Sequence, residues 1–135
     1  MNYNDFLRKS AEETGSIVCM GADPILEKIP IENENAEEKI SNFYSEIIRV
    51  CREEDCLPGA IKPNHAFYAQ YGFEGLKALK SVCEAVKKEN IPLIFDAKRG
   101  DIGKTNTAYA RECFGFWDAD SVTISPFLGE DSVLP

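Results

Sequence analysis

Segments with the pattern of buried strands alternate with segments with the pattern of helices along this chain of 135 residues. Strand patterns cover residues 16–23, 59–64, 92–98 and 119–125. Helix patterns cover residues 4–14, 35–54, 73–89 and 104–115. Strands joined by helices in this order pair in parallel through right-handed crossovers. The sequence therefore predicts an α/β fold with a parallel sheet, and we expect residues 1–135 to form a single domain.

The composition argues against several classes of protein. The formal net charge of −8 disfavours a nucleic-acid partner, because phosphate backbones attract basic surfaces. No apolar run approaches the ~18 residues of a membrane span, and the first 15 residues lack the apolar core of a secretion signal. The five cysteines show no CxxC spacing, so we expect reduced thiols and a cytoplasmic protein. Because His65 is the single histidine, we expect no metal site.

Polar residues suited to chemistry gather at the carboxyl ends of the predicted strands. They are Asp23, Lys62, Asn64, Asp96, Lys98 and Ser125. In parallel α/β folds the functional site lies at this end of the strands. We therefore expect these side chains to line one site.

Residues 94–105, IFDAKRGDIGKT, contain two competing motifs. The final GKT is the ending of a phosphate-binding P-loop, which also needs a glycine five positions before its GK. That position is Lys98, and Gly100 leaves too short a loop to encircle a phosphate. Asp101 within the loop would also repel a phosphate. The sequence therefore argues against a P-loop.

The second motif is the charge set Asp-x-Lys-x-x-Asp. Side chains alternate along a strand, so Asp96 and Lys98 should point to the same face. Gly100 permits a sharp turn that could return Asp101 toward the same pocket, and Lys62 ends the neighbouring strand. An alternating Lys–Asp–Lys–Asp array keeps each charge beside an opposite one. A structural salt-bridge network is the alternative, but four charges gathered at strand ends favour a functional site.

The chain resembles the orotidine 5′-phosphate decarboxylase family, in its longer bacterial and archaeal branch. The resemblance rests on FDAKRGDIGKT at residues 95–105, GADP at residues 21–24 and IKPN at residues 61–64, and it extends to SPFLGEDS at residues 125–132. It implies a TIM-type (β/α)8 barrel that is usually a dimer. The implied reaction converts orotidine 5′-monophosphate, a small-molecule nucleotide, to uridine 5′-monophosphate and CO2 in pyrimidine biosynthesis, without a cofactor or a metal.

The resemblance also implies the roles of the charge set. Lys98 would be the general acid that protonates C6 of the pyrimidine as CO2 leaves. Asp96 would lie against the substrate carboxylate. Lys62 would contact the ribose and brace the array.

Further residues would bind the substrate if the resemblance holds. Asp23 would hydrogen-bond the ribose, and Asn64 would lie nearby. Asp101, Ile102 and Thr105 would cross the dimer interface into the partner subunit's site.

Metal-dependent relatives share Asp-x-Lys-x-x-Asp. They are the keto-gulonate phosphate decarboxylases and the hexulose phosphate synthases, and they place a glutamate metal ligand at the end of the second strand. This chain has Lys62 at that position, which disfavours a metal-dependent sugar-phosphate decarboxylase or aldolase.

The length departs from the resemblance. A complete barrel takes ~200–250 residues or more, whereas this chain has four predicted strands and stops near the start of the fourth helix. In the family the second half supplies the groups that grip the phosphate. Three interpretations follow: an amino-terminal half that needs a carboxy-terminal half, a half-barrel that closes with a second copy, or a non-catalytic remnant that serves in binding.

Overall fold

The computed structural model describes residues 2–32 and 35–134, and its strands lie in one parallel order. The strands are β1 (Cys19–Ala22), β2 (Ala60–Pro63), β3 (Ile94–Arg99) and β4 (Ser121–Ile124). β1 pairs with β2 and β3 pairs with β4, both in parallel. Parallel bridges from Ile61 to Leu93 and from Asn64 to Asp96 join the two pairs. The spatial order is therefore β1–β2–β3–β4, as the alternating pattern predicted.

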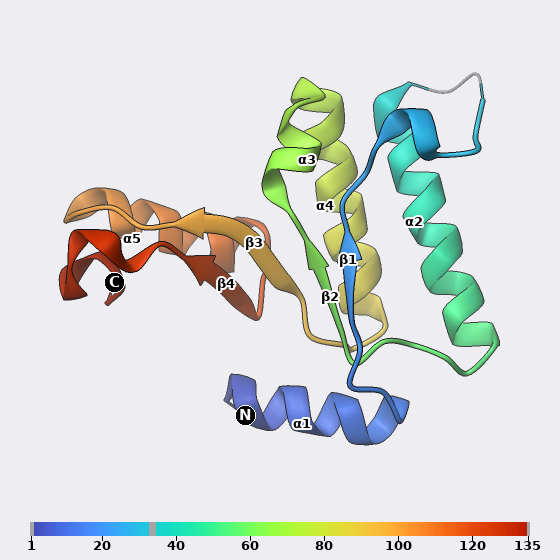
Figure 1. Cartoon of the computed structure of the whole chain (residues 1–135), viewed down its shortest axis with the longest axis horizontal. Helices are drawn as coiled ribbons and strands as arrows, with labels where there is room; N and C mark the ends of the chain where they lie inside the picture. Colours follow the sequence, from blue (N-terminus) through green and yellow to red (C-terminus); the bar gives the residue numbers. More distant parts are fainter. Residues whose placement is uncertain (1, 33–34, 135) are drawn as a thin grey trace.

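Helices cover one face of the strands and their amino-terminal ends (Figure 1). The α-helices are α1 (Tyr3–Thr14), α2 (Ala36–Glu53), α3 (His65–Ala69), α4 (Gly72–Lys88) and α5 (Lys104–Ala110). α5 continues as the π-helical segment η2 (Arg111–Phe116), and the 3-10 segments are η1 (Leu26–Lys28), η3 (Pro126–Leu128) and η4 (Glu130–Ser132). Figure 1 shows α2 and α4 side by side against β1 and β2, whereas α1 crosses below the strands.

Local hydrogen bonds fix where the helices begin and how α1 is held. The Asn2 side chain caps α1 by accepting from the Asp5 amide at 2.9 Å, and Asn35 caps α2 in the same way. The Ser10 hydroxyl donates to the Gly59 carbonyl at 2.9 Å. This bond ties α1 to the residue that leads into β2, so the helix closes the amino-terminal end of the strands.

The core lies between the strands and the helices α2, α3 and α4. Its fully buried side chains include Ile40, Ile61, Tyr68, Leu79, Val86, Leu93 and Phe95. Tyr68 is the largest of them. Residues of β2 and β3, among them Ile61 and Phe95, are therefore packed in the core just before the carboxyl ends of these strands.

Two elements differ from the predicted ones. The strand expected over residues 16–23 is shorter in the structure and spans Cys19–Ala22, and Ser16 instead passes close to Gly59. The two backbones approach so closely that a Cβ on Gly59 would lie 2.3 Å from the Ser16 carbonyl oxygen.

The short helix α3 was not predicted, although it carries the buried Tyr68. Residues 33 and 34 of the expected loop over residues 24–34 lie outside the described part of the chain.

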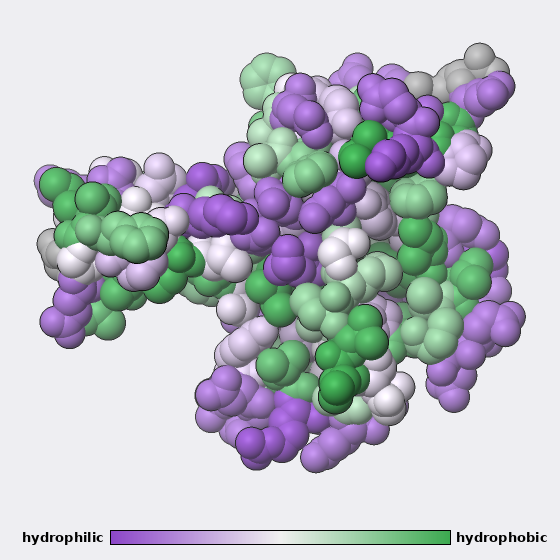
Figure 2. Space-filling model, in the orientation of Figure 1, coloured by the Kyte–Doolittle hydropathy of each residue, from purple (hydrophilic) through white to green (hydrophobic). Residues whose placement is uncertain are grey.

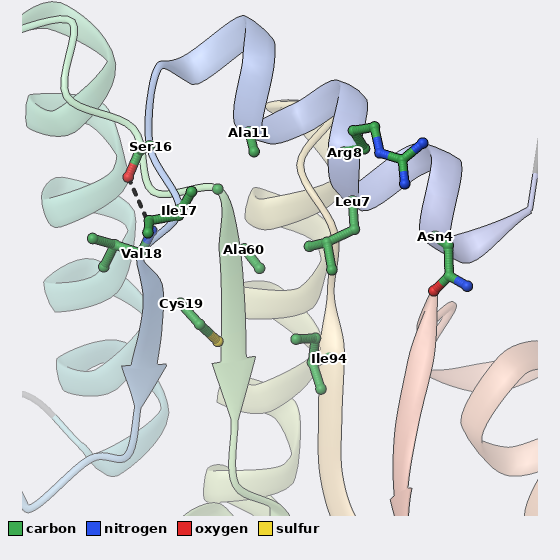
Figure 3. Close-up of a pocket in the computed structure, with 11 residues that line it drawn as sticks. Asn4, Leu7, Arg8, Ala11, Ser16, Ile17, Val18, Cys19, Ala60 and Ile94 are labelled. Carbon is green, nitrogen blue, oxygen red and sulfur yellow. Dashed lines mark hydrogen bonds between the residues drawn. The ribbon is translucent and has the colours of Figure 1, made fainter.

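A hollow of about 500 Å³ lies between α1 and the amino-terminal ends of the strands (Figure 3). Leu7 and Ala11 of α1 face Ile17, Ala60 and Ile94 across this mostly apolar space. It lies at the opposite end of the strands from the predicted site, so it is not where the predicted site residues could act.

Apolar side chains are exposed near both outer strands. Ile17, before β1, is 95% exposed, and Phe127, after β4, is 91% exposed. Figure 2 shows green apolar surface above α1 and again over the segment that ends at the carboxyl terminus. Within residues 2–32 and 35–134, no helix is long and apolar enough to cross a membrane.

Candidate active site

Asp96 lies between two lysines at the carboxyl ends of β2 and β3. Lys98 Nζ is 2.6 Å from Asp96 Oδ1, and Lys62 Nζ is 3.2 Å from Asp96 Oδ2. The Asp96 side chain is only 9% exposed, whereas that of Lys98 is 62% exposed. Three of the four charges expected in the array therefore meet, with a buried carboxylate that holds a more exposed ammonium.

The ionisation of Asp96 is set by two opposing effects. Burial by itself would raise the pKa of this carboxyl group. Hydrogen bonds from Lys98, Thr123 and Lys62 outweigh burial and lower the pKa of Asp96 to about 2. The group is therefore a carboxylate at neutral pH, and its charge keeps the two ammonium groups in place.

β3 contains a bulge where the array forms. Its pairing with β4 is regular up to Phe95 and resumes at Arg99, so residues 96–98 oppose Thr123 alone. Lys98 has φ of 48°, in the left-handed region that residues other than glycine seldom adopt. Bulges re-aim side chains next to active sites. Here the bulge, together with strand alternation, brings the side chains of residues 96 and 98 together.

The Thr123 hydroxyl fills the gap that the bulge leaves. It donates to Asp96 Oδ1 at 2.7 Å and accepts from the Lys98 amide at 3.1 Å. Sequence reasoning missed Thr123. The available signal was a polar side chain between two apolar residues, Val122 and Ile124, of a predicted strand.

Asp23 and Asn64 lie at the ends of the neighbouring strands, as predicted. Asp23 Oδ1 accepts from the Asn64 amide at 3.1 Å, which links the end of β1 to the end of β2. The Asn64 side chain accepts from the Ala66 amide at 3.1 Å and so caps α3. Both residues therefore lie at the same edge of the sheet as the array. The side-chain oxygen of Asn64, however, is already hydrogen-bonded as the cap of α3.

Asp101, Ile102 and Thr105 lie in the loop and the first turn of α5, and the structure does not join Asp101 to the array. Asp101 Oδ1 accepts from the Ile102 amide at 2.7 Å, and the Asp101 amide donates to Asn106 Oδ1 at 3.0 Å. Among the described residues no ion pair involves Asp101. The expected return of Asp101 to the pocket of its own chain is therefore not seen, because the adjacent Ile102 amide holds its carboxylate. Ile102 and Thr105 are exposed, and their expected role across a dimer interface stays a prediction.

Ser125, the last candidate, lies just beyond β4. Its amide donates to the Arg99 carbonyl at 2.7 Å, which restarts the β3–β4 pairing after the bulge. Its hydroxyl is 3.4 Å from the Lys98 carbonyl oxygen. Ser125 therefore supports the backbone around Lys98.

The opposite face of β3 is anchored by an ion pair. Arg99 donates two hydrogen bonds to Glu112, at 3.1 and 2.7 Å, and Glu112 also accepts from the Trp117 indole at 3.2 Å.

His65 lies edge-on to Phe95 with the ring centres 5.7 Å apart. Burial, followed by the nearby Arg99 charge, lowers the pKa of His65. These contacts make His65 part of the aromatic packing around Phe95.

The donor set around Asp96 does not suit a metal ion. A divalent cation at the carboxylate would face the ammonium groups of Lys62 and Lys98. Within the described ranges of the chain, no three His, Cys, Asp or Glu side chains are grouped to hold a metal.

A family model described as "Orotidine 5'-phosphate decarboxylase / HUMPS family" matches residues 16–135. The chain belongs to this family. The fold is α/β, and its four described strands, in the order β1–β2–β3–β4, correspond to about the first four βα units of the (β/α)8 barrel of this family. The fold class expected from the sequence is therefore confirmed.

Curated relatives of this decarboxylase family match along most or all of the chain. The orotidine 5′-phosphate decarboxylase of Verminephrobacter eiseniae is 36% identical over 137 residues, which cover 100% of this chain and 48% of the relative. That of Flavobacterium johnsoniae is 42% identical over 123 residues, covering 89% of this chain and 44% of the relative. The chain thus spans about half the length of the curated relatives that it matches.

Two solved structures also match nearly all of this chain but half or less of their own length. The OMP decarboxylase of Leishmania donovani aligns with a TM-score of 0.79 at 35% identity, over 98% of this chain and 48% of that chain. The UMP synthase of the same organism aligns with a TM-score of 0.80 at 34% identity, over 98% of this chain and 27% of that chain.

Proposed function

We propose that this chain supplies the catalytic array for the decarboxylation of orotidine 5′-monophosphate to uridine 5′-monophosphate. The observation that carries the proposal is the contact of 2.6 Å between Lys98 Nζ and Asp96 Oδ1 at the carboxyl end of β3. The family of the chain and the names of its relatives support the choice of reaction. The five free cysteines agree with a cytoplasmic setting for pyrimidine biosynthesis.

In the proposed mechanism, the C6–carboxylate bond of the substrate breaks and its electron pair stays on C6 as CO2 leaves. The Lys98 ammonium lies beside this carbon and favours the developing negative charge over the ground state, which is the condition for a higher kcat. Lys98 Nζ then gives its proton to C6, which yields the product and a neutral amine that regains a proton from solvent.

Asp96 has two functions in this proposal. Its carboxylate fixes the Lys98 ammonium, and it lies beside the substrate carboxylate that is lost. Repulsion between the two carboxylates would raise the ground state, an account that is contested for enzymes in general. Lys62 completes the array from the neighbouring strand and contacts the ribose, as does Asp23 from the end of its strand, and Asn64 lies nearby.

The proposal includes partners. The residues that bind the substrate phosphate would come from the carboxy-terminal half of the barrel, which the relatives contain and this chain does not span. The exposed apolar residues near both outer strands, Ile17 and Phe127 among them, support association with such a half or with a second copy. In a homodimer, Asp101, Ile102 and Thr105 would reach the partner subunit's site.

The test is the ultraviolet absorbance change of orotidine 5′-monophosphate with two preparations. One is the 135-residue chain alone, and the other is the chain joined to the carboxy-terminal half of the Verminephrobacter eiseniae relative. We expect turnover in the joined protein and very weak or no turnover in the chain alone. A folded joined protein without turnover would contradict the proposal, and equal turnover in both would show that the chain completes its own site.

A further inference from the structure

The Thr123 hydroxyl is hydrogen-bonded both to a side chain of the array, that of Asp96, and to its backbone, at the Lys98 amide. It touches both members of the shortest ion pair of the site, Asp96 through Oδ1 and Lys98 through its amide. Asp96 Oδ1 in turn accepts from Lys98 Nζ at 2.6 Å. These three hydrogen bonds form a closed loop that runs from Thr123 to Asp96, along the Lys98 side chain, and back through its amide.

The bulge makes this hydroxyl necessary. The Lys98 amide lies in the part of β3 where pairing with β4 is interrupted, and its left-handed φ of 48° turns it out of the regular ladder. A backbone N–H that loses its strand partner needs another acceptor. Thr123 Oγ1 is that acceptor, since it is the single β4 residue that faces the bulge.

The position of the Lys98 ammonium depends on these contacts more than on packing. Its side chain is 62% exposed, so it has few neighbours that could restrict its rotatable bonds. Its one ion pair among the described residues is with Asp96. Whatever orients Asp96 and the Lys98 backbone therefore orients the ammonium.

We propose that Thr123 is a positioning residue, which holds the Lys98 ammonium in the place required for proton transfer by fixing both Asp96 and the bulged backbone. The inference rests on the proposed function, because that function gives the ammonium its task. Thr123 itself is not expected to touch the substrate.

The matched variants are Thr123→Val, which keeps the branched shape and removes the hydroxyl, and Thr123→Ser, which keeps the hydroxyl. In the joined protein we expect Thr123→Val to lower kcat roughly 10- to 100-fold with KM nearly unchanged, because a small displacement of a reacting group costs this much. Thr123→Ser should restore most of kcat. A merely structural residue would instead give similar losses in both variants or a change confined to KM.

A second measurement does not depend on turnover. In the isolated chain, NMR can follow the titration of the Asp96 carboxyl carbon, whose charged neighbours are Lys62 and Lys98. We expect Thr123→Val to raise the pKa of Asp96 toward its ordinary value and Thr123→Ser to leave it low. The Lys98 amide of the unaltered chain should exchange with solvent at least roughly 10-fold more slowly than an open loop amide, because it is hydrogen-bonded.

The outcomes separate the two proposals. If the joined protein shows no turnover, the proposed function fails, while the Asp96 titration and the Lys98 exchange still decide the role of Thr123. If Thr123→Val and Thr123→Ser behave alike in titration or in kcat, the positioning role is wrong. If the valine variant fails to fold, as judged by circular dichroism, unprotected exchange at Lys98 in the unaltered chain would overturn the inference, and protection would support it.

Discussion

Lys98 and Asp96 lie two residues apart on β3, and their side chains meet at 2.6 Å because the strand bulges between them. An undistorted strand would place both on one face but would keep the Lys98 backbone in the ladder with β4. The bulge instead turns Lys98 into the left-handed region, a conformation that costs on the order of 1 kcal/mol outside glycine. Strain of this kind at a charged site is typical of functional residues.

Asp96→Asn should change how stability depends on pH. The folded pKa of Asp96 is about 2, below its ordinary value of 3.8, so between these pH values the unfolded chain binds more protons than the folded chain. Asp96 therefore contributes about 2 kcal/mol of stability that is fully present above about pH 4 and is lost as the pH falls through 2. Urea unfolding from pH 2 to pH 6 should show a steeper rise in the free energy of unfolding for the unaltered chain than for Asp96→Asn. Parallel curves would contradict the proposed stabilisation of the carboxylate.

Gly100→Ala should destabilise the turn that follows the array. A Cβ at this position would lie 2.5 Å from the Ser125 carbonyl oxygen, a backbone atom that cannot rotate away. We expect a loss of about 1–3 kcal/mol in the free energy of unfolding, measured in urea, because one of the two strand ends must move. Gly115→Ala in η2 is the matched control, since its Cβ would meet no atom within 4 Å. Equal effects of the two variants would show that the close approach to Ser125 is not what constrains this turn.

Chelators should not affect turnover of the joined protein. The Asp96 carboxylate already accepts from two ammonium groups and a hydroxyl, and a divalent cation placed there would be repelled by Lys62 and Lys98. We expect the same kcat before and after dialysis against EDTA. Loss of activity that added Mg²⁺ restores would contradict this account of the site and would favour the metal-dependent branch of the family.

The sequence was informative where a pattern depends on one segment alone. Strand alternation and the position of strand ends predicted that Lys62, Asp96 and Lys98 would meet, and the structure brings them together. The helix expected over residues 104–115 is present as α5 and η2. Its π-helical half was not predicted, and its Glu112 is held by Arg99 of β3, a contact that the helix segment alone does not specify.

The misses come from interactions between segments or from local competition. Thr123 acquires its position from the register between β3 and β4, which no single segment specifies. Asp101 was expected in the array because Gly100 permits a turn, yet the Ile102 amide holds its carboxylate in the loop. The start of α3 could have been predicted, since Asn64 is a favourable N-cap residue.

The most direct measurement of the central claim is the rate of orotidine 5′-monophosphate decarboxylation by the joined protein with Lys98→Ala, compared with Lys88→Ala. Lys88 is an exposed lysine at the end of α4, which lies by the opposite end of the strands. We predict that Lys98→Ala lowers kcat by roughly 10²- to 10⁴-fold, the usual contribution of a general acid, while Lys88→Ala leaves kcat unchanged. Folded Lys98→Ala protein with the kcat of the unaltered protein would contradict the assignment of Lys98 as the proton donor.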